Sequence, residues 1–66
     1  MHYWEHETAN GHHIRISWNG AATFNLQTPI GGEWVDYECF TVYGIDDAQT
    51  ALEIALDHVD EDGNHV

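Results

Sequence analysis

Six histidines are the side chains of this 66-residue chain best suited to metal binding or acid–base chemistry. His12 and His13 are adjacent, so a regular strand would direct their side chains to opposite faces. His6 could meet either of them across a hairpin, with a glutamate nearby. No HExxH or CxxC spacing accompanies the set. We therefore expect no metal site and no cofactor.

Nucleophiles with an activating context are missing from the sequence. Ser17 is the only serine and has no nucleophile-elbow pattern around it. Cys39 lies in an apolar run without a basic neighbour, which predicts a small buried hydrophobic residue rather than a reactive thiol. Gly31 and Gly32 belong to neither a P-loop nor a GxGxxG pattern. We expect no catalytic residue and no enzymatic activity.

Carboxylates are the most abundant reactive groups. Twelve Asp and Glu residues stand against a single basic residue, Arg15, and the formal net charge is −11. No basic patch exists to neutralise phosphates, which argues against direct binding to DNA or RNA. Two explanations of the imbalance remain open. One is a cationic partner, such as a nucleic-acid-binding protein, and the other is an acidic surface that keeps the protein solvated in high salt.

The carboxylates after Gly44 are sorted by helical spacing. The residues between 46 and 61 predict a helix, which Asp46 or Asp47 can cap and Gly63 can end. Its apolar stripe consists of Ala48, Ala51, Leu52, Ala55, Leu56 and Val59. The opposite face carries Asp46, Glu53, Asp57, Asp60 and Glu61, and the charges continue into Asp62.

This acidic stripe is not expected to stabilise the helix. Glu53 and Asp57 are like-charged neighbours, and acids at a helix C-terminus oppose the macrodipole. Positions i and i+4 are roughly 5–6 Å apart, similar in scale to successive phosphates on a nucleic-acid strand. We therefore interpret the stripe as a partner-binding surface. A second acidic group is predicted on the fourth strand, with Trp34 as an aromatic anchor beside it: Glu33, Asp36 and Glu38.

The pattern of the first half of the chain predicts two β-hairpins. Asn-Gly pairs at 10–11 and 19–20 mark two turns, and strands are expected at about 2–9, 12–18 and 22–28. Alternation places Ile14, Ile16 and Trp18 on one face, together with Phe24 and Leu26. A three-residue second turn would pair Trp18 with Ala22 and Ile16 with Phe24. The same reasoning at the first turn places Trp4 and His6 on the core face, and Tyr3 is the alternative anchor to Trp4.

A fourth strand is expected at about 33–43, without clean alternation. Either a bulge near 36–38 or burial on both faces would explain its pattern. The chain therefore predicts one α+β domain spanning 1–66. In it, an antiparallel sheet of three to four strands is covered on one face by a single C-terminal helix.

The size, the missing lysine and the helical acidic stripe resemble small phage-encoded inhibitors, a group that includes anti-CRISPRs and DNA mimics. This resemblance implies an inhibitor that blocks a nucleic-acid site on a host protein. The stretch 40–56 also resembles the last strand and helix of HicB-type antitoxin domains, although that family's proline- and glycine-bearing segment before the helix is absent here.

Two functions follow as expectations. The first is an acidic inhibitor that binds a cationic nucleic-acid-binding protein. The alternative is a small structural or interaction module, antitoxin-like or salt-adapted, whose acids serve solubility. No signal peptide or membrane span is recognised, so we expect a cytoplasmic protein, in the bacterial host if it is phage-encoded. A homodimer is compatible with the exposed aromatic residues.

Overall fold

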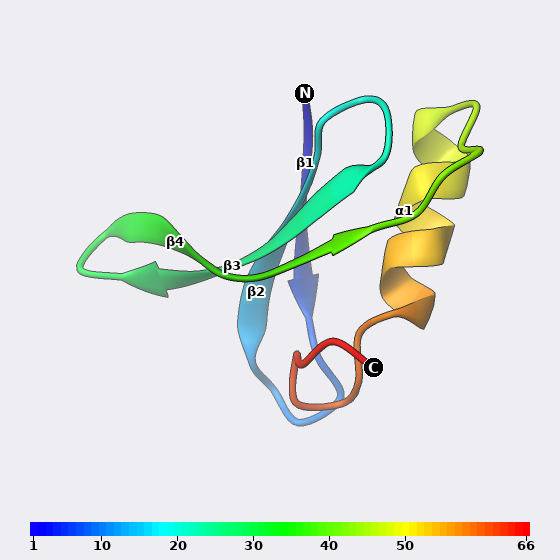
Figure 1. Ribbon diagram of the computed structural model, residues 1–66. Coiled ribbons are helices and arrows are strands. Elements are labelled where there is room, and N and C mark those ends of the chain that lie inside the picture. The colour runs from blue at the N-terminus through cyan, green and yellow to red at the C-terminus, as the bar shows by residue number, and fades with distance from the viewer.

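A computed structural model describes all residues from 1 to 66. It contains four strands and one helix: β1 (His2–Glu7), β2 (His13–Trp18), β3 (Thr23–Ile30), β4 (Glu33–Thr41) and α1 (Ala48–Asp57). The strands pair antiparallel in the order β1-β2-β3-β4, and α1 follows beside the sheet (Figure 1). This arrangement confirms the predicted α+β class with four strands and a C-terminal helix. No helix is long and apolar enough to cross a lipid bilayer.

The core joins three strands to the helix. Eight buried hydrophobic residues form one cluster: Ile14, Ile16, Trp18, Phe24, Leu26, Phe40, Ala51 and Ala55. Ala51 and Ala55 are the only buried residues of α1, whereas Leu56 of the predicted stripe is exposed. The small side chains of the two alanines are therefore the helix's fully buried contribution to the core, and complete cover of one sheet face stays a prediction.

The first hairpin has the predicted faces, with Trp4 rather than Tyr3 on the core side. Trp4 lies opposite Ile16 and His6 lies opposite Ile14, so both β1 residues are on the core face and half-buried. β1 ends at Glu7, two residues earlier than expected.

The second hairpin has the predicted faces but a different register. Ile16 lies opposite Leu26 rather than Phe24, which is a slip of two residues. The cause is the Asn19 side chain, whose Oδ1 accepts hydrogen bonds from the backbone amides of residues 21, 22 and 23. These bonds stabilise a longer turn than alternation alone predicts. Because the slip is an even number of residues, every side chain keeps its face.

A bulge interrupts β4. Leu26 pairs with Glu38 and Gln27 pairs with Asp36, which leaves Tyr37 as the extra residue. Of the two explanations for the irregular pattern, the bulge is correct. It also corrects the prediction for Cys39, which is exposed opposite Asn25. Phe40 takes the core position, and the neighbouring residue of this edge strand must then point outward.

The helix is shorter than the predicted span of 46–61. Asp47 is its N-cap, and its carboxylate accepts a 2.7 Å hydrogen bond from the backbone N–H of Thr50, which lowers the Asp47 pKa. The helix ends at Asp57, with His58 as the C-cap. Beyond it the chain turns back instead of continuing the helix.

Candidate interaction surface

Two of the predicted stripe carboxylates remain on the helix. Glu53 and Asp57 are exposed and separated by one helical turn, as the sequence predicts. Asp46 is exposed immediately before the cap Asp47. Glu53 and Asp57 are therefore separated by the i to i+4 distance, which is similar in scale to that between successive phosphates on a nucleic-acid strand.

Asp60 and Glu61 do not belong to the helix, which corrects the prediction of a single helical stripe. Asp60, Glu61 and Asp62 lie in a C-terminal turn, closed by a bridge between Val59 and His65. Asp60 is used inside this turn: its Oδ1 accepts from the backbone N–H groups of Asp62 and Asn64, both at 2.9 Å. This local bonding competes with the helix and explains its early end.

The C-terminal turn is tied to the turn between β1 and β2. The backbone N–H of Asn10 donates to the Glu61 carbonyl at 3.0 Å, and the Asn10 side chain donates to Asp62 Oδ1. Gly63 completes the junction with a φ of 88°, and a Cβ there would stand 3.3 Å from Tyr37 Oη. Positive φ and close packing both require glycine at this position.

The second acidic group lies elsewhere. Glu33 begins β4 at the tip of the β3–β4 hairpin, which projects away from α1 and from the C-terminal end (Figure 1). Asp36 is engaged by Gln27, whose Nε2 donates to Asp36 Oδ1 at 2.6 Å. Glu38 is exposed on the same edge strand. The structure therefore separates Glu33 from the helix and tail carboxylates.

The only arginine is held within the molecule. The Arg15 guanidinium carbon lies 4.3 Å from the Tyr3 ring centroid and 5.0 Å from that of Trp34. Its Nε donates to Gln27 Oε1 at 2.7 Å. Trp34, predicted as a partner anchor, is half-buried and also meets the His13 ring edge-on at 5.4 Å. Arg15, the one permanently charged cationic side chain, is therefore engaged in packing contacts within the molecule.

Most carboxylates have no partner in the chain. Five of the twelve take part in a hydrogen bond or ion pair, including Glu5, whose Oε1 lies 2.9 Å from His13 Nε2. The other seven are exposed: Glu7, Glu33, Glu38, Asp46, Glu53, Asp57 and Glu61. Since their charges are unpaired, they contribute their full negative potential to the surface.

Two histidines close the tail over the core. His65 stacks on Phe40 at 4.6 Å between ring centroids, and His58 stacks on the same ring at 5.1 Å. His58 Nδ1 and His65 Nε2 are 3.3 Å apart. No group of three or more His, Cys, Asp or Glu side chains is arranged to hold a metal ion.

Tyr37 fixes the bulge against the tail. Its hydroxyl donates a 2.5 Å hydrogen bond to the Gly63 carbonyl. Burial raises the pKa of this hydroxyl above 10.0, and the charges of Glu38 and Asp60 raise it further. The raised pKa means that the folded state holds the proton more tightly than the unfolded chain does. The resulting stability is complete below pH 10.0 and is lost as the pH rises through the folded-state pKa.

We therefore expect the urea midpoint of unfolding to fall at alkaline pH, and we expect Tyr37→Phe to remove most of this fall. The variant should also lose about 1 kcal/mol at neutral pH, because the Gly63 carbonyl loses its donor. Tyr3→Phe is the matched control and should keep the alkaline dependence. An equal alkaline fall in Tyr37→Phe would contradict the assignment.

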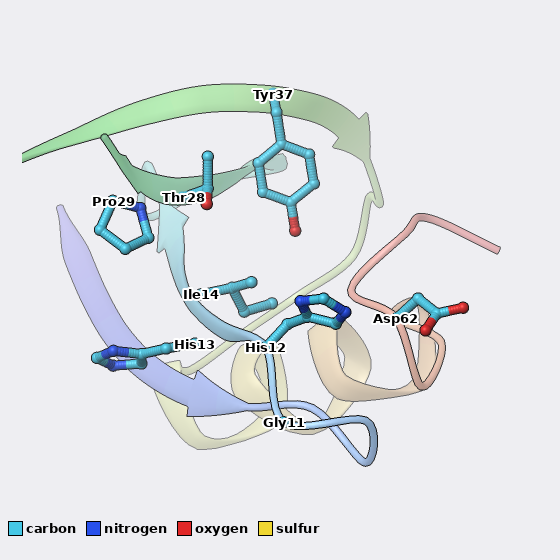
Figure 2. Close-up of a pocket in the computed structure, with 8 residues that line it drawn as sticks. All are labelled: Gly11, His12, His13, Ile14, Thr28, Pro29, Tyr37 and Asp62. Atoms are coloured by element: carbon cyan, nitrogen blue, oxygen red, sulfur yellow. The ribbon is translucent and has the colours of Figure 1, made fainter. Parts of the chain in front are cut away.

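Residues that sequence reasoning did not select line an open pocket beside the bulge (Figure 2). Among them are His12, Thr28 and Tyr37, which come from three different strands or their ends. The predicted residue Asp62 forms another part of the wall. No periodicity could have revealed this site, because it depends on the tail returning to the β1–β2 turn.

Comparisons with known proteins yield no relatives: no family model matches the chain, and no curated protein or solved structure is recognisably similar to it.

Proposed function

We propose that this chain is an inhibitory binding protein that presents carboxylates to a cationic, nucleic-acid-binding protein. The presenting surface, here called the helix–tail surface, consists of Glu53, Asp57, Glu61 and Asp62. The observation that carries the proposal is the unpaired state of most carboxylates in a chain whose only arginine is held between two aromatic rings. A surface of one sign steers oppositely charged partners and rejects nucleic acid itself.

The spacing on α1 supports a nucleic-acid-binding partner. Glu53 and Asp57 stand one turn apart on a regular helix, and a protein groove that holds successive phosphates can accept carboxylates at that separation. The helix presents them rigidly, which lowers the entropy lost on binding.

A second function has its own support. Asp36, Asp60 and Asp62 accept hydrogen bonds within the chain, so three of the predicted binding residues have local structural roles. This favours the alternative of a small interaction module, antitoxin-like or salt-adapted, in which the remaining acids serve solubility.

Affinity capture separates the two functions. The immobilised domain is exposed to a bacterial lysate, eluted with a salt gradient, and the eluate is identified by mass spectrometry. We expect one nucleic-acid-binding protein to elute as salt rises and to be displaced by added DNA or RNA, because both compete for the same cationic groove. Recovery of no such protein, or of one insensitive to salt, would contradict the proposal and favour the solubility role.

A further inference from the structure

The pocket beside the β4 bulge has the size of a small ligand site. This open pocket has a volume of about 410 Å³, within the range of roughly 300–1,000 Å³ typical of such sites. Ile14 contributes a buried apolar surface, and Pro29 adds a second apolar surface. In Figure 2 the Tyr37 hydroxyl and the His12 ring point toward each other across the pocket.

The polar groups around the pocket are rich in hydrogen-bond acceptors. Asp62 uses Oδ1 to accept from Asn10, and its Oδ2 is free. Tyr37 donates its only hydroxyl hydrogen to the Gly63 carbonyl, so the hydroxyl oxygen can only accept further hydrogen bonds. Thr28 adds a hydroxyl oxygen to the same wall. A ligand that donates hydrogen bonds matches these three groups, and each neutral histidine of the wall, His12 and His13, offers one further acceptor nitrogen beside its own donor.

The electrostatic environment favours a cation in the same place. In addition to the larger effect of burial, the carboxylates of Glu38 and Asp60 lie close enough to the Tyr37 hydroxyl to raise its pKa, so the wall around this hydroxyl has negative potential. Asp62 adds a carboxylate of its own. Arg15 does not line the pocket, because it is held by Tyr3 and Trp34, and the two histidines that do line it, His12 and His13, carry a charge only when protonated.

We infer that this pocket is an anchor site for an arginine side chain of the cationic partner, with the guanidinium between Tyr37 and Asp62 and the aliphatic stem against Ile14 and Pro29. The inference rests on the proposed function and names the group that the partner inserts. Arginine fits better than lysine, because its planar fork of five donors can bond several acceptors while stacking on an aromatic ring. Its apolar stem uses the floor of the pocket.

Titration with N-acetyl-arginine amide, followed by heteronuclear NMR at about pH 8 where an ordinary histidine is neutral, tests the site. We expect saturable shifts at His12, Thr28 and Tyr37, with a Kd on the order of 10 mM for one exposed ion pair and one ring contact. The citrulline amide has the same shape without the charge, and it should bind at least roughly threefold more weakly.

Asp62→Asn should weaken arginine-amide binding by roughly threefold, because the amide still accepts from Asn10 but carries no charge. Glu33→Gln removes the same charge at the distant hairpin tip and should leave the Kd unchanged. Equal binding of the arginine and citrulline amides would overturn the inference, and so would shifts spread over all acidic residues without saturation.

The two proposals fail in different ways. If the capture experiment recovers a salt-released, nucleic-acid-binding partner but the pocket does not bind arginine amide, the anchor site is wrong and the proposed function stands. If the pocket binds arginine amide but no cationic partner is recovered, the anchor chemistry stands and the proposed function is wrong.

Discussion

Replacing Phe24 with alanine is expected to leave the chain largely unfolded at room temperature. Phe24 is fully buried and stacks on Phe40 at 5.0 Å and on Trp18 at 6.3 Å between ring centroids. Removing a buried phenylalanine ring costs about 3–5 kcal/mol, through lost burial and the cavity that remains. A domain of this length has a total stability of only about 3–10 kcal/mol. The unpaired negative charges reduce that margin further.

The unfolding is measured by amide dispersion in a heteronuclear NMR spectrum and by urea titration. Tyr43→Ala is the matched control: it also removes an aromatic ring, but Tyr43 is 83% exposed. Its stability should change by no more than about 0.5 kcal/mol. A dispersed spectrum and a cooperative urea transition in Phe24→Ala would show that the core does not depend on this stack.

The sheet could be predicted from the sequence because its face pattern is set by residue types along each strand. Ile14, Ile16 and Trp18 alternate with polar residues, and alternation assigns a face whatever the partner strand is. Register was harder, because the Asn19 side chain decides the length of the second turn. Bonds between a side chain and nearby backbone amides are local, but their number cannot be read from residue type alone.

The tail and the pocket could not be predicted, because they depend on contacts between residues far apart in the chain. The helical periodicity of the sequence continues through Val59. In the structure, however, the Asp60 side chain accepts a hydrogen bond from the backbone of its own turn, and Asn10 donates hydrogen bonds to Glu61 and Asp62. The bulge at Tyr37 also involves a contact between distant residues, because the Tyr37 hydroxyl donates a hydrogen bond to the Gly63 carbonyl. Tertiary contacts therefore overrode a helical pattern that was locally sound.

Replacing three helix–tail carboxylates by amides, Glu53→Gln with Asp57→Asn and Glu61→Gln, is expected to weaken binding to the captured partner by roughly three- to a hundredfold. Each exposed ion pair contributes about 0.2–1 kcal/mol, and tenfold in affinity corresponds to about 1.4 kcal/mol. Asp60 is left unchanged because its carboxylate holds the C-terminal turn. The measurement is the Kd over a range of salt concentrations, and the salt dependence should become shallower.

The matched control removes as much charge from other places: Glu5→Gln, Glu7→Gln and Glu33→Gln. Both triple variants change the formal net charge from −11 to −8, since each removes three negative charges. Only the helix–tail variant should lose most of its affinity if the layout of carboxylates matters. Equal weakening in both would mean that net charge alone attracts the partner. If binding is unchanged while the helix–tail variant becomes more stable at low salt, the solubility role is correct, because Glu53 and Asp57 repel each other and Asp57 opposes the helix dipole.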